Sequence, residues 1–375
     1  MKIVLTGGGS GGHFYPIIAI VEAMRKIIHE QKLVEPTLYF LAPDPYNRAL
    51  LFDQNIVYKR IVSGKIRRYF SILNFFDVFK LGIGMLQAIW AIFWIYPDVI
   101  FSKGGYGSVP VVFAGRILGI PIIIHESDSK VGRANKWAGK FATKIAVSYP
   151  EAAKFFDEKK VAWTGNPIRA EIQTPVAEGA HEFLGLEENV PVILVLGGSQ
   201  GAAKINDAIL DALPELIKKY QIIHQTGKEN FKEVNDTAKI ILGTSQLISR
   251  YKPFDYLNDL AMRMSAGAAD LVITRAGSQL FEIANWKIPS IVVPLSKEVS
   301  HDQHSNAFTY ARGGGGIVIE DNNLSSEVLT NEIERIFADK NLYETMVAGA
   351  TKFSKPDAGR TIAEEILKIV VAHEK

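Results

Sequence analysis

Three glycine-rich turns, each directly after an apolar run, are where residue types and spacing indicate chemistry. They are GGGSGG at 7–12, GGYGS at 104–108 and GGSQG at 197–201. A glycine-rich turn that leads into a helix binds anions, because glycine permits positive φ and the free N–H groups and helix dipole point at the ligand. Three such turns favour one phosphate-rich ligand, or two, over tight turns without a ligand.

His13 follows the first turn directly. Doubly wound α/β domains bind ligands at the carboxyl ends of their strands, so this imidazole is expected to face a ligand cleft. With an ordinary pKa of about 6.5, a histidine there could take a proton from an attacking hydroxyl. A histidine that only caps the helix by hydrogen bonding is an equal alternative from the residues alone.

The spacing of Gly7, Gly9 and Gly12 also fits the G-x-G-x-x-G of dinucleotide-binding domains. An NAD(P)-dependent oxidoreductase is therefore an alternative function. That fingerprint requires an acidic residue roughly 20 residues further on, but the nearest acid at a strand end is Asp44, well beyond that distance. His13 also stands where a P-loop would continue with Gly-Lys, so a P-loop is excluded.

Apolar, β-branched runs alternate with helix-length segments through most of the chain, which predicts βαβ units and parallel sheets. We expect a helix over 16–28, with Pro16 in its first turn. The expected strands are 2–6, 37–42, 98–102, 121–126, 144–148, 191–197, 271–276 and 290–295.

The chain also resembles itself. IVLTGGGSGGH at 3–13 and VILVLGGSQGA at 192–202 both read as a strand, a glycine-rich turn and a helix. This duplication predicts two doubly wound domains. The proline-containing segment 164–182 has little periodicity and is the expected linker.

Composition excludes several classes of function. The 375 residues contain no cysteine, which rules out disulfides, thiolate nucleophiles and cysteine-based metal sites. A net charge of +2 gives no indication of a nucleic-acid partner. Only residues 3–6 lie between Lys2 and the first glycines. This stretch is too short for the apolar core of an export signal, so none is expected.

The segment 59–97 has an unusual distribution of charge. Its first part is basic, and LGIGMLQAIWAIFWIYP at 81–97 is uncharged. That stretch is slightly short for a membrane span and contains Gly82, Gly84 and Gln87, so we expect none. A basic, aromatic-rich face that docks on an anionic membrane surface is favoured over a plain buried helix. The basic residues are Lys59, Arg60, Lys65, Arg67, Arg68 and Lys80.

No metal or bound cofactor is expected. The chain lacks a D-x-D motif, whose two carboxylates commonly hold a diphosphate-bridging Mg²⁺. His301, Asp302 and His304 could form a metal cluster, but we interpret them as a polar loop beside the ligand.

In order along the chain, these motifs resemble the MurG family of bacterial glycosyltransferases, which add N-acetylglucosamine to lipid I to make lipid II. The motifs that carry the resemblance are GGGSGGHFYP (7–16), SKGGYGSVP (102–110), HESDSKVGRANK (125–136), GNPIR (165–169), GGSQGA (197–202), HQTGK (224–228), TRAGS with FE (274–282) and DQHSNA (302–307). The resemblance covers nearly the whole chain. It implies the GT-B fold, two Rossmann-like doubly wound domains that face a cleft.

The resemblance implies a domain for each substrate. Residues 1–168, joined by a C-terminal helix at 353–375, would bind lipid I and associate with the membrane, and residues 169–352 would bind UDP-N-acetylglucosamine. His13 becomes the candidate general base, with His125 and Glu126 as alternatives. The implied acceptor diphosphate-binding residues are Gly8, Gly9, Ser10, Gly11, Gly12, Gly104, Gly105 and Tyr106.

For the donor, the resemblance places Arg169 and the turn at Ser199 and Gln200 toward the UDP phosphates. Leu257 would lie near uracil, and Glu282 would accept hydrogen bonds from the ribose hydroxyls. The implied donor-binding residues are Arg169, Ser199, Gln200, Leu257, Glu282, Gln303 and Asp128. Asp128 stands where the family often has asparagine; a carboxylate could still bind a sugar hydroxyl, but its charge near a diphosphate is unexplained.

The expected reaction is inverting transfer of N-acetylglucosamine from UDP-N-acetylglucosamine to the muramoyl hydroxyl of lipid I. The expected partners are these two substrates, an anionic membrane surface and a cell-wall synthesis complex, without nucleic acid. The protein would then be peripheral, on the cytoplasmic side of the bacterial cell membrane. The alternatives are another GT-B enzyme such as a UDP-sugar glycolipid synthase, the NAD(P)-dependent oxidoreductase, and a non-catalytic nucleotide-sugar binding protein.

Overall fold

The computed structural model describes residues 1–65, 73–197, 202–297 and 299–373. The chain forms two compact units. The first comprises Met1–Arg169 and Lys355–Lys375, and the second comprises Ala170–Ser354. These divisions lie close to the predicted boundaries at 168–169 and 352–353.

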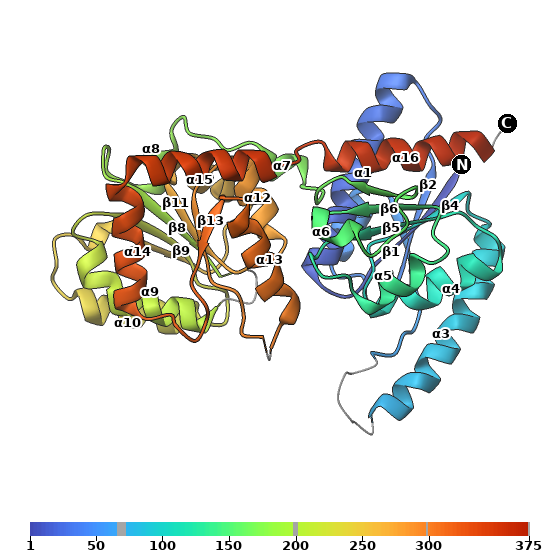
Figure 1. Ribbon diagram of the computed structural model, residues 1–375, viewed down its shortest axis with the longest axis horizontal. Helices are drawn as coiled ribbons and strands as arrows, with labels where there is room; N and C mark the ends of the chain where they lie inside the picture. The colour runs from blue at the N-terminus through green and yellow to red at the C-terminus, as the bar shows by residue number, and fades with distance from the viewer. Residues whose placement is uncertain (66–72, 198–201, 298, 374–375) are drawn as a thin grey trace. The chain divides into compact units, whose positions relative to one another are not determined.

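The first unit contains a seven-stranded sheet in the order β3-β2-β1-β4-β5-β6-β7, in which every pairing is parallel (Figure 1). The strand order reverses between β1 and β4, as in doubly wound folds. The strands are β1 (Lys2–Thr6), β2 (Thr37–Ala42), β3 (Ile56–Arg60), β4 (Val99–Ser102), β5 (Ile122–Glu126), β6 (Lys144–Val147) and β7 (Val161–Trp163).

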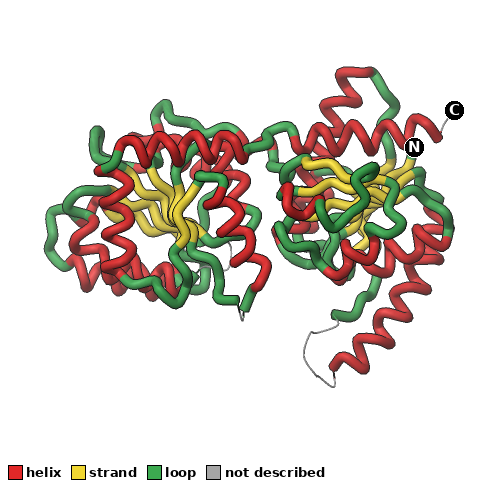
Figure 2. Tube along the Cα trace, in the orientation of Figure 1, coloured by secondary structure: helices red, strands yellow, loops and turns green. Residues whose placement is uncertain are grey.

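Helices cover both faces of this sheet (Figure 2). Ile3 and Leu5 point to the face on which α1 and α16 pack, whereas Val4, between them, points to the face of α3 and α4. The helices are α1 (Gly11–Gln31), α2 (Arg48–Asp53), α3 (Leu73–Ile95), the 3₁₀ turn η1 (Tyr106–Ser108), α4 (Val109–Ile117), α5 (Arg133–Ala138), α6 (Pro150–Ala153) and α16 (Ala358–His373).

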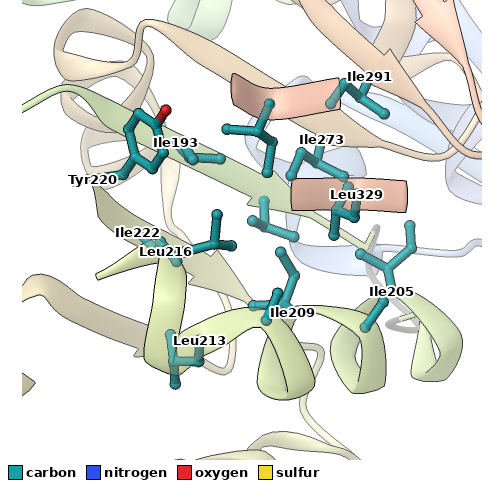
Figure 3. Close-up of a cluster of buried hydrophobic side chains, with 14 of the residues drawn as sticks. Ile193, Ile205, Ile209, Leu213, Leu216, Tyr220, Ile222, Ile273, Ile291 and Leu329 are labelled. Carbon is teal, nitrogen blue, oxygen red and sulfur yellow. The ribbon is translucent and has the colours of Figure 1, made fainter. Parts of the chain in front are cut away.

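The second unit repeats this design with the parallel order β10-β9-β8-β11-β12-β13. Its strands are β8 (Val192–Leu196), β9 (Gln221–Gln225), β10 (Tyr251–Phe254), β11 (Leu271–Thr274), β12 (Ser290–Val292) and β13 (Gly316–Val318). Its helices are α7 (Ala170–Gln173), α8 (Ala180–Leu184), α9 (Ala203–Leu216), α10 (Phe231–Leu242), η2 (Ile248–Arg250), α11 (Asp259–Ala268), α12 (Gln279–Trp286), α13 (His301–Arg312), α14 (Ser326–Ala338) and α15 (Lys340–Phe353). Figure 3 shows the core between α9 and the sheet, where Ile205 and Ile209 meet Ile193 and Ile273.

The prediction of two doubly wound α/β domains is confirmed. Two local predictions are wrong. Helix α1 begins at Gly11, so Pro16 lies inside it rather than in its first turn. The expected linker 164–182 contains α7 and most of α8, which belong to the second unit because Ile172 and Leu184 are buried there.

The C-terminal helix α16 belongs to the first unit, where the resemblance places it. Ile362 and Ile366 pack into the same core cluster as Ile17 of α1. At the surface, the guanidinium of Arg360 binds Glu30 of α1 at 2.8 Å.

Candidate active site

The reversal of strand order gives each unit one place where two loops diverge at the carboxyl ends of neighbouring strands, which is where doubly wound folds bind ligands. In the first unit these are the loops after β1 and β4. They carry the glycine turns at 7–12 and 104–108. In the second unit they are the loops after β8 and β11, which carry GGSQG and the TRAGS motif.

The two glycine turns of the first unit touch each other. The N–H of Gly8 donates to the carbonyl of Gly104 at 2.9 Å. Gly104 and Gly105 have φ of 85° and 81°, values that residues with a side chain rarely adopt. A Cβ added to Gly105 would lie 2.9 Å from the Cα of Gly8. Glycine is therefore required at position 105 for the contact between the turns. The next residue, Tyr106, places its hydroxyl near Gly9.

His13 lies in the first turn of α1, beside this contact. Its Nδ1 is 2.7 Å from the hydroxyl of Ser10, and its Nε2 faces Gly105, where an added Cβ would come within 3.3 Å. Burial and then the positive charge of Lys103 lower the pKa of His13 to about 4. The ring is therefore neutral at pH 7 and able to accept a proton.

Glu126, at the end of β5, is buried and organises the loop that follows. Its carboxylate accepts hydrogen bonds from the N–H groups of Asp128 and Gly132 and from the amide of Asn135, at 3.0, 2.9 and 3.1 Å. Burial and the neighbouring charge of Asp128 raise the pKa of Glu126 to about 7. These bonds give Glu126 an organising role as well as its predicted catalytic one.

His125 is completely buried. Its Nε2 lies 3.0 Å from the carbonyl of Gly165 and therefore donates to it, while no described residue forms a hydrogen bond with its Nδ1. Burial lowers the pKa of His125 well below its usual value. Of the three predicted catalytic residues, the geometry favours His13, because the other two are enclosed.

In the second unit, Asp321 joins the two loops of the expected donor site. Its carboxylate binds Arg275 of the TRAGS motif at 2.6 Å and Lys204, at the start of α9, at 2.7 Å. Burial alone would raise the pKa of Asp321, but the hydrogen bonds from Lys204 and Arg275 lower it. Arg275 also donates to the carbonyl of Val293 at 3.1 Å, which fixes its guanidinium.

The other predicted donor residues are spread over the second unit. The side chain of Leu257 is buried in the core, and its N–H donates to Gln225 at 3.1 Å. Glu282 lies in the first turn of α12, and the amide oxygen of Gln303 accepts from the N–H of Leu295 at 3.4 Å. Ser199 and Gln200 lie outside the described residues.

Two predicted donor residues belong to the first unit. Arg169 is its last residue before the second unit begins, rather than the first residue of the donor domain, and its guanidinium lies 4.7 Å from the ring centre of Tyr15. Asp128 lies in the loop after β5, beside Glu126. Their predicted roles toward the donor stay predictions.

The sequence contains the two halves of one known family. Residues 3–147 match the N-terminal domain of glycosyltransferase family 28, and residues 192–362 match its C-terminal domain. A transferase from Clostridium novyi (strain NT) is 40% identical over 345 residues, 91% of this chain and 92% of that protein. The chain belongs to glycosyltransferase family 28.

Other relatives agree with this assignment. A second family 28 relative, from Bacillus cereus (strain ATCC 10987 / NRS 248), is 38% identical and covers 97% of this chain and 99% of its own. Both relatives are named UDP-N-acetylglucosamine–N-acetylmuramyl-(pentapeptide) pyrophosphoryl-undecaprenol N-acetylglucosamine transferases. The crystal structure of Acinetobacter baumannii MurG has the same fold, with a TM-score of 0.73 at 24% identity over 98% of this chain and all of that one.

Four residues of this family 28 enzyme were not predicted from the sequence, although they hold the two sites together. They are Lys103, Asn166, Lys204 and Asp321. Lys103 directly follows a strand and precedes two glycines, which is a signal that could have been used. The sequence around Asp321 contains no such signal, because its partners Lys204 and Arg275 are distant in sequence.

Proposed function

We propose that this enzyme transfers N-acetylglucosamine from UDP-N-acetylglucosamine to the muramoyl hydroxyl of lipid I, which gives lipid II. The observation that carries the proposal is the position of His13 at the contact between two glycine turns. Glycine turns of the kind that suits a diphosphate and a neutral base thus lie together. The names of the curated relatives support the same substrates.

In the proposed step the acceptor diphosphate binds at the two glycine turns of the first unit, and the acceptor hydroxyl lies beside the Nε2 of His13. The ring takes the hydroxyl proton as the oxygen attacks the anomeric carbon, and UDP leaves from the opposite side. The sugar therefore changes from α-linked to β-linked. The negative diphosphate would raise the pKa of His13 from about 4, so acceptor binding would strengthen the base.

The second unit would bind the donor. Arg275 and Lys204, held together by Asp321, lie at the loops of its switch point and supply positive charge for a diphosphate. We keep Arg169, Ser199, Gln200, Leu257, Glu282 and Gln303 as proposed donor contacts, with Asp128 near the reacting sugars. The proposed mechanism uses no metal; among the residues that the structure describes, no three His, Asp or Glu side chains could hold one.

Helix α3 carries the proposed membrane surface. By length and composition alone, the helix segment Phe75–Ile95 could cross a membrane. The helix nevertheless packs on α4 through Ala88 and Ile92 (Figure 1). The side chains of its other face are exposed, including Phe75, Phe76, Phe79, Leu86, Trp90, Phe93 and Trp94.

This arrangement favours a peripheral enzyme that docks on an anionic membrane from the cytoplasmic side. Aromatic side chains suit the membrane interface, and nearby Lys and Arg each contribute about 1 kcal/mol on anionic lipid. Lys80 of α3 is exposed. Arg67 and Arg68, also predicted to take part, lie outside the described residues.

A transfer assay tests the proposal. The purified enzyme is given radiolabelled UDP-N-acetylglucosamine with a lipid I analogue, and in parallel with diacylglycerol. We expect label only in the lipid I product. Transfer to diacylglycerol alone would favour the glycolipid synthase, and absence of transfer to both would contradict a transferase with these substrates.

A further inference from the structure

Lys103, directly after β4, is the one fully buried ammonium among the residues that the structure describes, with 1% of its surface exposed. Its Nζ donates to the side-chain oxygen of Asn166 at 3.2 Å, and Asn166 is buried as well. Burying a charge is costly unless opposite charge and hydrogen bonds compensate it. The neutral amide of Asn166 does not compensate the buried charge of Lys103, so opposite charge is expected nearby.

The opposite charge comes from the neighbouring strand. Because β4 pairs with β5 in parallel, residues that follow the two strands lie at the same edge of the sheet. The carboxylates of Glu126 and Asp128 both stabilise the charged form of Lys103. Burial lowers the pKa of Lys103, and the two carboxylates oppose that effect by favouring the charged ammonium.

The same two acids belong to the loop that closes this side of the site. The carboxylate of Glu126 holds the N–H groups of Asp128 and Gly132, so the loop between them follows the position of Glu126. Lys103 also lies under the first glycine turn, where its Cβ is 3.5 Å from a Cβ added to Gly7. One cation thus adjoins both walls of the acceptor site.

We propose that Lys103 is a positioning residue of the acceptor site. Its ammonium is the counter-charge of Glu126 and Asp128 and holds the loop after β5. A carboxylate at 128 is tolerated beside a diphosphate because the ammonium of Lys103 already balances its charge. The part that concerns turnover rests on the proposed function.

The charged and titratable groups that interact with Lys103 are His13, His125, Glu126 and Asp128. The lysine disfavours protonation of both histidines and favours ionisation of both acids. Removing Lys103 would leave the negative charges of Glu126 and Asp128 uncompensated. These charges would then repel the acceptor diphosphate. Removing the charge of Asp128 at the same time would relieve part of that repulsion.

A double-mutant cycle tests this prediction. Lys103→Met should lower kcat/KM for the lipid I analogue about 100-fold, chiefly by raising its KM, with little change in KM for UDP-N-acetylglucosamine. Adding Asp128→Asn should recover at least about 10-fold of that loss. The exposed Lys140, changed to Met, is the matched control in the same unit and should leave both constants unchanged.

Losses that multiply in the double variant would overturn the proposal, as would an equal rise in both KM values. If Lys103→Met does not fold, a double variant that folds supports the counter-charge role. A double variant that also fails to fold contradicts it.

A titration without substrate separates this proposal from the proposed function. NMR signals of the His13 ring, assigned with His13→Ala, are followed against pH in the wild type and in Lys103→Met. The pKa of His13 should rise in part from about 4 when the cation is removed, because burial, the larger cause of its low pKa, remains. An unchanged His13 pKa would overturn the role of Lys103 even in an enzyme that makes lipid II.

Discussion

His13 is the residue on which the proposed chemistry depends most. Its Nδ1 is fixed by Ser10, and its Nε2 points to the place where the two glycine turns meet. A base must lie within hydrogen-bond reach of the proton it removes, and geometry decides this before pKa does. His13 is half-buried beside the two glycine turns, whereas His125 is completely buried.

Replacing His13 with Ala should lower kcat about 10²- to 10⁴-fold, because general-base catalysis is worth that much. UDP affinity, measured by calorimetry, should persist, since the donor loops belong to the second unit. His29→Ala, on the exposed end of α1, is the control. Near-normal turnover of His13→Ala would transfer the role to Glu126 or His125.

His224 shows a different use of a buried histidine. Its Nδ1 accepts from the hydroxyl of Tyr251 at 2.9 Å, and its Nε2 donates to the side-chain oxygen of Asn206 at 3.0 Å. Burial lowers the pKa of His224 to about 3. The unfolded chain begins to bind a proton at this histidine near pH 6.5. In the folded chain the ring stays neutral down to about pH 3.

The sign of the resulting pH dependence follows. Below about pH 6.5 the unfolded chain binds a proton at residue 224 that the folded chain does not, so stability falls as pH falls, by about 2 kcal/mol at pH 5. Urea unfolding at pH 7 and pH 5 measures this. In His224→Gln the loss should shrink, whereas in the exposed His29→Gln it should match the wild type; equal losses in all three would contradict the account.

At the scale of elements, Asp321 links the start of α9 to the loop after β11 through Lys204 and Arg275. Replacing Asp321 with Asn should lower the free energy of unfolding by about 1–3 kcal/mol, because Arg275 loses its buried partner. It should also raise KM for UDP-N-acetylglucosamine while KM for the acceptor stays constant. These values come from urea unfolding and initial-rate kinetics.

The neighbouring acid provides the control for that variant. Glu320 is 45% exposed and binds His304 at 2.9 Å, so Glu320→Gln should cost less than about 1 kcal/mol. An Asp321→Asn variant no different from Glu320→Gln in stability and donor KM would contradict the linking role.

The exposed face of α3 allows a second test at this scale. Trp94 is 64% exposed, so Trp94→Glu should leave the free energy of unfolding within about 0.5 kcal/mol of the wild type. It should weaken binding to vesicles that contain anionic lipid, measured by sedimentation. Ile240→Glu, at an 82% exposed position on α10, should bind vesicles like the wild type; equal binding by all three would argue for a structural helix only.

The elements that could be predicted are those whose residues are buried on both faces. Strands β1 and β2 begin and end where their apolar runs do. The edge strands β3 and β7 are largely exposed, so hydrophobicity gave no signal. β9 was missed because buried Gln and His flank its two isoleucines, and their hydrogen-bond partners come from distant residues.

At the scale of the whole molecule, the duplication seen in the sequence is a duplication of topology. Both sheets are parallel, and in both the strand order reverses beside the first strand, where doubly wound folds bind ligands. The candidate site could be predicted as far as its local motifs extend. Contacts such as Lys103 with Asn166 could not, because only the packing of β4 beside the 164–166 loop brings them together.

The family assignment and the site geometry also separate the alternatives considered for the whole molecule. A family 28 glycosyltransferase with paired glycine turns and a neutral histidine is favoured over an NAD(P)-dependent oxidoreductase. Stabilisation by UDP-N-acetylglucosamine and not by NAD in a thermal unfolding experiment would be the corresponding whole-molecule observation.

The anomeric configuration of the product tests the central claim most directly. The wild-type enzyme is incubated with α-linked UDP-N-acetylglucosamine and a lipid I analogue, and the coupling constant of the new anomeric proton is measured by NMR. Direct attack by a hydroxyl that His13 activates predicts a β-linked disaccharide. An α-linked product, or no disaccharide at all, would contradict the account.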